Sequence, residues 1–163
     1  MIEAPALAVD LVKARLAAVY AGVLAVVCAE RGVDYDNADY PMAIMATRAT
    51  VRPEDMSNYD FPFAWVQAIP DGSVNDRGTN SLLSTSAVTC FIADRHQDGE
   101  VLAARLQCHL VALVRTFNVF RSPTRDWEGS VTEWTGTPPY APDELWVGSV
   151  GVQIDVRIVE ALD

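Results

Sequence analysis

Residues 146–159 constrain the fold most, because apolar and polar side chains alternate along this stretch. The even positions from Trp146 to Ile158 are mostly apolar, whereas odd positions include Ser149, Gln153 and Asp155. A period of two residues is typical of a β-strand with one face on a core. The segment therefore predicts a long strand whose other face lies in water or at an interface.

Two stretches predict helices. Residues 5–31 have apolar side chains at three- and four-residue steps, with Pro5 suited to a first turn and Gly32 to a C-terminal cap. The later half is apolar nearly all round, so we expect it to be covered by its own sheet, either alone or together with a neighbouring subunit. A second helix is predicted within residues 96–120, with Asp94 or Asp98 as its cap. Its apolar stripe is Leu102, Leu106, Leu110, Leu113 and Phe117.

The remaining segments predict short strands and loops. Strands are expected at residues 42–51, 61–69, 86–94 and 131–134, and the third of these is apolar on both faces, as an interior strand would be. Residues 71–84 are polar and rich in Gly, Asn and Ser, which predicts a long exposed loop. A Gly- and Pro-rich turn is expected to run through residue 142. No internal repeat or composition break divides the chain, so residues 1–163 are expected to form one α/β (α+β) domain.

Charge and cysteine content narrow the classes of partner. Twelve Lys and Arg face twenty-two Asp and Glu, for a formal net charge of −10, which disfavours sequence-driven nucleic-acid binding and anionic membranes. The three cysteines, Cys28, Cys90 and Cys108, lie in apolar runs and are expected to be buried free thiols, although Cys90 and Cys108 could meet. The uncharged apolar stretch at residues 16–29 is shorter than the ~18–20 residues of a membrane span, and acidic residues precede it, unlike a signal peptide.

The sequence carries no recognised catalytic or metal-binding motif. Phosphate-loop, dinucleotide, serine-hydrolase and zinc spacings are all absent from the sequence. His96 is interpreted as a solvated residue of a strand-to-helix connection, and His109 as a helix residue whose neighbour Cys108 points elsewhere. We therefore predict no catalytic, cofactor-binding or metal-binding residues and no enzyme activity.

The carboxylates and aromatic side chains have simpler explanations than catalysis. Helix capping and solvation explain the acidic pairs Glu54 and Asp55, Asp94 and Asp98, and Asp143 and Glu144. The cluster Asp34, Asp36 and Asp39 lacks the glycine and glutamate of a calcium loop. Core or interface anchoring is expected of Trp65, Trp127, Trp134, Tyr140 and Trp146.

Four stretches together resemble the tail terminator (tail completion) proteins of long-tailed bacteriophages. They are the first helix ending in Arg31 and Gly32, residues 51–62 leading into a strand and the turn at 70–72, the strand running directly into a helix over 87–117, and the closing strand at 145–156. The resemblance covers most of the chain, although each motif is degenerate. The polar segment 71–84 departs from the family pattern.

The resemblance implies a small mixed, mainly antiparallel sheet with two main helices packed on one face. It also implies a structural virion protein, synthesised in the host cytoplasm. Six copies would form a hexameric ring at the head–tail junction that ends tail polymerisation and contacts tail tube and neck proteins. DNA would pass through this ring without sequence-specific binding, which suits an acidic chain. Two alternatives stay open: another neck, minor tail or capsid-associated component, and an unrelated small α/β enzyme or ligand-binding domain.

Overall fold

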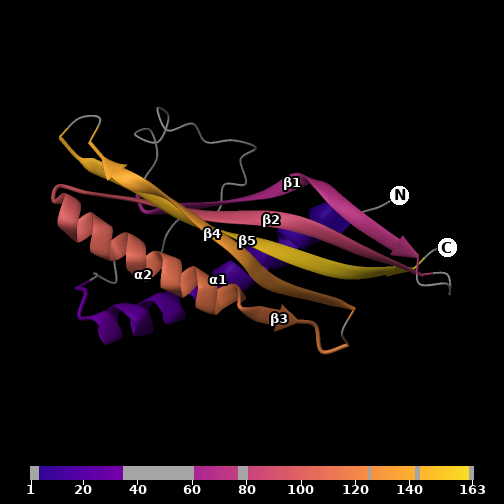
Figure 1. Ribbon diagram of the computed structural model, residues 1–163. Helices are drawn as coiled ribbons and strands as arrows, with labels where there is room; N and C mark the ends of the chain where they lie inside the picture. Colours follow the sequence, from indigo (N-terminus) through magenta and orange to yellow (C-terminus); the bar gives the residue numbers. More distant parts are fainter. Residues whose placement is uncertain (1–3, 35–60, 77–80, 125, 142–143, 162–163) are drawn as a thin grey trace.

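The computed structural model describes residues 4–34, 61–76, 81–124, 126–141 and 144–161. They form two layers, a five-stranded sheet and two helices on one of its faces (Figure 1). The elements are α1 (Ala4–Arg31), β1 (Phe63–Asp76), β2 (Ser81–His96), α2 (Gly99–Phe117), β3 (Val119–Arg121), β4 (Trp127–Tyr140) and β5 (Trp146–Ala161). The predicted α+β class is confirmed, and each strand pair in the order β1-β2-β5-β4-β3 is antiparallel.

The predicted closing strand is the middle strand of the sheet, β5. It pairs with β2 from Trp146↔His96 to Ala161↔Ser81, and with β4 on its other side. Ile154 and Val156 are buried on the helix side, while Asp155 between them lies on the opposite face. The alternation of residues 146–159 thus arises because helices cover only one face of the sheet.

The end of α1 is fixed by the cap that the sequence predicts. Gly32 has φ of 65°, its N–H donates to the Ala29 carbonyl at 3.3 Å, and Val33 N–H donates to the Cys28 carbonyl at 3.0 Å. This pair of bonds is a Schellman motif, and glycine adopts its left-handed backbone at little cost. From Ala8 to Val27 one stripe of α1 is buried, and the helix lies under β1 and β2.

The second helix begins at the later of the two predicted caps. The Asp98 side chain accepts from the backbone N–H groups of Glu100 and Val101, whereas Asp94 is buried in β2. The predicted stripe is confirmed at Leu102, Leu106, Leu113 and Phe117 but not at Leu110, which is only half-buried. His109 occupies the buried position instead, because both of its ring nitrogens have partners inside the protein.

The prediction of a long loop at residues 71–84 is wrong. β1 continues to Asp76 and β2 begins at Ser81, so the two form a hairpin with pairs from Gly72↔Ser86 to Asp76↔Leu82. The register shifts between Ala68 and Gly72, where Pro70 lies in an edge strand. An edge strand tolerates proline and a bulge because only one of its sides pairs.

The prediction of a short strand at 131–134 followed by a turn is also wrong in extent. β4 runs from Trp127 to Tyr140, through the Gly- and Pro-rich segment. The side chains from Thr132 to Pro138 are exposed, so burial leaves no alternation to detect in the sequence. The strand β3, which pairs with the start of β4, was not predicted. The strand predicted at 42–51 lies outside the described residues.

Candidate functional site

A chain of polar side chains lies sealed between the sheet and the helices. The ring of His109 on α2 bonds through Nδ1 to the Tyr20 hydroxyl on α1, and through Nε2 to Asp94 Oδ2 on β2 at 3.1 Å. Tyr20 and His109 are 0% exposed and Asp94 is 1% exposed. Asp94 Oδ1 also accepts from the Arg95 backbone N–H at 2.7 Å. Three elements are therefore tied together at one buried point.

The bonding partners define a consistent set of proton positions. A carboxylate only accepts, so His109 Nε2 carries the hydrogen donated to Asp94. Neutral imidazole then leaves Nδ1 as an acceptor, and the Tyr20 hydroxyl donates to it. The order carboxylate, imidazole, hydroxyl is that of a catalytic triad in which the hydroxyl is the nucleophile. Such a triad needs space for a substrate atom beside the hydroxyl. All three groups are buried away from solvent. We therefore assign the network a structural role, which is to hold α1, α2 and β2 together.

Of these three residues, the sequence singled out Asp94 and His109, but not as partners, and it missed Tyr20. A usable signal exists, because Tyr20 falls on the same helical stripe as the buried Leu16 and Leu24. A tyrosine on a buried stripe needs a bonding partner. Which partner it meets depends on how α1 and α2 pack, which no local pattern encodes.

The other residues considered for chemistry are not brought together. His96 is the last residue of β2 and pairs with Trp146, so it does not lie in the connection that the sequence predicted, and its Nδ1 accepts from the Asp98 backbone N–H at 2.9 Å. Asp34 is exposed, whereas Asp36, Asp39, Glu54, Asp55 and Asp143 lie outside the described residues. Within the described part of the chain, no group of three or more His, Cys, Asp or Glu is placed to hold a metal ion.

The three cysteines are buried free thiols, as predicted, but the pair that meets is a different one. The Cys28 thiol on α1 is the one beside the Cys108 thiol on α2, whereas the sequence left a meeting of Cys90 and Cys108 open. Burial raises the pKa of the Cys108 thiol to about 11, with Cys28 adding to the effect. Burial alone raises the pKa of Cys90, on β2, even further.

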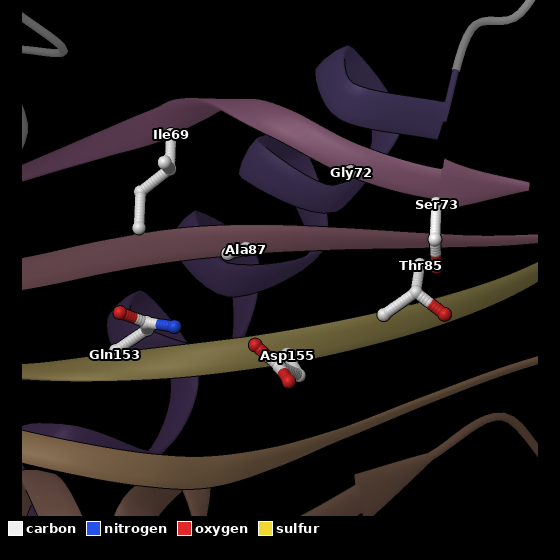
Figure 2. Close-up of a pocket in the computed structure, with 7 residues that line it drawn as sticks. All are labelled: Ile69, Gly72, Ser73, Thr85, Ala87, Gln153 and Asp155. Atoms are coloured by element: carbon white, nitrogen blue, oxygen red, sulfur yellow. The ribbon is translucent and has the colours of Figure 1, made fainter.

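Within the described part of the chain, no helix covers the sheet face away from α1 and α2; this open face has a hollow beside the middle strand, β5. The hollow has a volume of about 380 Å³, and Figure 2 shows its lining side chains on the side of the sheet opposite α1. Its lining consists of Ile69, Gly72, Ser73, Thr85, Ala87, Gln153 and Asp155. A Cβ added to Gly72 would lie 2.7 Å from the Thr85 carbonyl oxygen, so a larger residue there would push β1 from β2. Apart from Ile69, the lining consists of small or polar residues.

A second, smaller hollow of about 190 Å³ shares Asp155 with the first. Its lining includes Glu128 and Arg157, which form an ion pair at 3.7 Å and are both more than half exposed. An exposed pair of this kind contributes ~1 kcal/mol or less to stability. Asp155 is thus the shared acidic group at the centre of the open face.

Aromatic side chains cover one end of the same face. Trp65 stacks on Phe91 at 4.8 Å between ring centroids, and Phe63 lies 5.5 Å from Trp65. A Cβ on Gly151 would lie 2.3 Å from the Phe91 ring, so glycine provides the space that this ring occupies. The predicted anchoring role fits the buried Trp65, whereas Trp134 on β4 is 67% exposed.

The outer face of α1 is a second uncovered surface, on the other side of the molecule (Figure 1). Its exposed residues between Lys13 and Glu30 are Ala14, Ala17, Ala18, Ala21, Gly22, Ala25, Val26 and Ala29. Arg15, within this stretch, turns to α2 and donates to the Thr116 carbonyl at 3.0 Å, and Glu30 bonds Arg115 at 2.9 Å. The outer face of α1, defined by the residues above, is therefore uncharged.

By length and composition alone, α1 is also apolar enough to cross a membrane. The segment that meets this criterion spans Ala6–Arg31, longer than the uncharged stretch at residues 16–29, and core helices of soluble proteins meet it too. One such helix near the N-terminus is weak evidence for a membrane span.

The sequence matches no known protein family, and no curated protein matches it. The two surfaces available to a partner in the described part of the chain are the outer face of α1 and the open face of the sheet.

Proposed function

We propose that this chain is an assembly protein whose copies pack head to tail into a closed ring, and that this ring ends the tail tube of a long-tailed bacteriophage. The observation that carries the proposal is the presence of two different uncovered faces on opposite sides of a two-layer fold. A symmetric dimer buries one patch twice, whereas a ring uses two different patches on every copy.

The outer face of α1 suits close packing against another subunit. From Ala14 to Ala29 it extends over about 22 Å of helix, at ~1.5 Å per residue. Small side chains allow a neighbouring backbone to approach closely, and no charge has to lose its water. The exposed Leu7 and Val26, at 42% and 54% exposure, add apolar area at its two ends.

The open face of the sheet offers a complementary surface. Its centre is hollow, with Gly72, Ser73 and Ala87 among the lining residues, so it can receive a ridge from a second copy. We place the outer face of α1 of one copy on the open face of the next. Repeating this contact by rotation closes a ring, and six copies is the number that the family resemblance implies.

The resemblance supports the specific role at the head–tail junction. A hexamer would carry about −60 formal charges, which repel one another and the DNA phosphates. Free subunits are therefore expected to stay apart until a tail end templates the ring. The lumen would let DNA pass without holding it, and the rims would contact tail tube and neck proteins.

A mixing experiment tests the head-to-tail packing. Ala21→Glu adds a charge to the outer face of α1, and Gln153→Glu adds one to the open face. Each variant alone should fail to cap tail tubes that lack a terminator, viewed by electron microscopy. In a mixture, the intact outer face of α1 of Gln153→Glu can pack on the intact open face of Ala21→Glu. This contact joins only two subunits, so the mixture should give dimers on a tail end and no ring. Gln107→Glu, which adds the same charge on the exposed side of α2, is the matched control and should cap normally.

Two outcomes count against the proposal. Density at the tail end without rotational symmetry would exclude a ring, and normal capping by Ala21→Glu would exclude the outer face of α1 as an interface. Binding at the portal and not at the tail end would favour the alternative of another neck component. The hollow beside Asp155 supports the remaining alternative, a ligand-binding domain, which saturable binding of a small molecule blocked by Asp155→Ala would favour.

A further inference from the structure

Asp155 places a negative charge on the open face of the sheet, where the proposed ring excludes water. Its side chain is half-buried and lines both hollows of this face. Its cross-strand neighbours are Ala87 on β2 and Ser130 on β4, and neither is charged. Within the described residues, the Asp155 carboxylate makes no hydrogen bond or ion pair. Its solvation therefore depends on water.

The other charged groups of the open face leave an excess of negative charge. Arg157, two residues along β5, forms its ion pair with Glu128 on β4. The smaller hollow thus contains two carboxylates and one guanidinium. Glu133, which pairs with Gln153, adds another carboxylate to β4. The lining residues that β1 and β2 contribute to the larger hollow are uncharged, namely Ile69, Gly72, Ser73, Thr85 and Ala87.

The surface that the ring places on Asp155 brings no net charge. In the proposed contact, the outer face of α1 of the neighbouring copy covers the hollow, and this face is uncharged. Each of its ends carries one acidic and one basic residue, Asp10 and Lys13 at the first end and Glu30 and Arg31 at the second. An ionised carboxylate that loses its water without gaining a partner is strongly disfavoured, whereas the neutral acid is tolerated far better.

We infer that closure of the ring is coupled to the uptake of a proton by Asp155, so that acidic conditions favour the closed ring. The inference rests on the proposed function, because it is the contact between α1 and the sheet that removes water from Asp155. The proton comes from the solvent and binds a carboxyl oxygen, and no other bond changes. Each closed contact then holds one proton more than the free subunits do. The affinity of the contact therefore rises as the pH falls, by up to about tenfold per pH unit.

A binding assay across pH tests the inference. Tail tubes that lack a terminator are mixed with the full chain at values between about pH 5 and about pH 8, a range in which an aspartate in water is ionised. Sedimentation of the tubes then gives the bound fraction at each protein concentration. The unchanged protein should bind about tenfold more tightly, or better, at the acidic end of the range. Asp155→Asn, which has the shape of the neutral acid, should bind tightly throughout and with little dependence on pH.

Glu100→Gln is the matched control for net charge. It also removes one negative charge, but from the exposed first turn of α2, away from both interacting faces. It should keep the pH dependence of the unchanged protein. Circular dichroism confirms that both variants are folded. The pH series of the unchanged protein tests the inference even if Asp155→Asn folds poorly.

The results separate failure of the inference from failure of the proposed function. If the unchanged protein caps tube ends with the same affinity at every pH, the ring stands and the coupling to Asp155 is wrong. If Asp155→Asn binds more weakly than the unchanged protein, a cation of the neighbouring copy pairs with the ionised carboxylate, which also overturns the inference. If neither protein binds tube ends at any pH, the proposed function fails and the inference fails with it.

Discussion

The buried bond between Tyr20 and His109 gives the sharpest stability prediction. Tyr20→Phe removes only the hydroxyl, so the ring continues to fill its space and no large cavity forms. His109 Nδ1 then loses the donor that the hydroxyl supplies, inside a region that is 0% exposed. Leaving a buried polar atom without this bond costs about 1–3 kcal/mol. For a chain of this size that lowers Tm by about 2–12 °C.

Thermal unfolding followed by circular dichroism measures the effect. Thr132→Val is a suitable control, because it also removes one hydroxyl, at an exposed position of β4. The control should change stability by no more than about 0.5 kcal/mol. Equal Tm values for Tyr20→Phe and the unchanged protein would refute the argument that the hydroxyl satisfies the imidazole.

A double-mutant cycle extends the same reasoning to Asp94. Asp94→Asn keeps the shape of the side chain, but His109 loses the charge-assisted bond at Nε2. Tyr20 and Asp94 act on opposite nitrogens of one ring, so their effects should be coupled by about 0.5–3 kcal/mol. If the changes in unfolding free energy of the two single variants add up to that of the double variant, the two bonds are independent and His109 does not link them.

Three further predictions follow from burial and pairing. Leu113→Ala should cost about 2–5 kcal/mol in chemical denaturation, and Leu110→Ala clearly less, because only Leu113 is fully buried. Because burial raises the pKa of Cys90, the folded state keeps a proton that the unfolded chain releases above the ordinary thiol value of 9.0. Stability should therefore be intact below pH 9.0 and fall by about 1.4 kcal/mol per pH unit above it, and Cys90→Ala should reduce that slope in denaturation curves measured across alkaline pH. Deleting residues 74–83 should lower Tm by several degrees or yield insoluble protein, because it removes paired strand from β1 and β2; an unchanged Tm would restore the loop interpretation.

Local signals were enough to predict the elements that are buried on one side. The alternation of β5, the stripe of α2 and the glycine cap at Gly32 each depend on residues within one element. The strand at 86–94 was correctly predicted to lie in the interior of the sheet, because both of its faces carry apolar side chains. In these segments one physical requirement, the burial of a face, determines the residue pattern.

The edges of the sheet could not be predicted in the same way. The second halves of β1 and β4 contain turn-forming residues such as Gly72 and Pro138, and the side chains described there, at 72–74 and 132–138, present no buried face that would select alternation. Pairing with β2 and β5, which are the next strands along the chain, keeps these segments extended although their residues favour turns. Strand pairing therefore overrides the intrinsic preference of these residues for turns.

The buried contacts were missed for a related reason. Tyr20, Asp94 and His109 come from three elements, so their meeting depends on how α1 and α2 pack. The same packing brings Cys28, and not Cys90, to Cys108. The sequence predicts that such residues are buried, but the choice of partner is a property of the whole fold.

The sealed network and the proposed ring are connected through geometry. In a head-to-tail ring, the angle between the two interacting faces of each copy sets how many copies close it. Here one face belongs to α1 and the other to the sheet, and the Tyr20–His109–Asp94 bonds tie α1 to β2 through α2. An apolar contact alone would let α1 shift along the sheet, whereas directed bonds favour one position. Loosening the network by Tyr20→Phe should therefore broaden the range of ring sizes or leave rings open while both faces remain intact. If Tyr20→Phe has a clearly lowered Tm but still forms uniform closed rings, the network does not set the ring geometry. Its role would then be in stability alone.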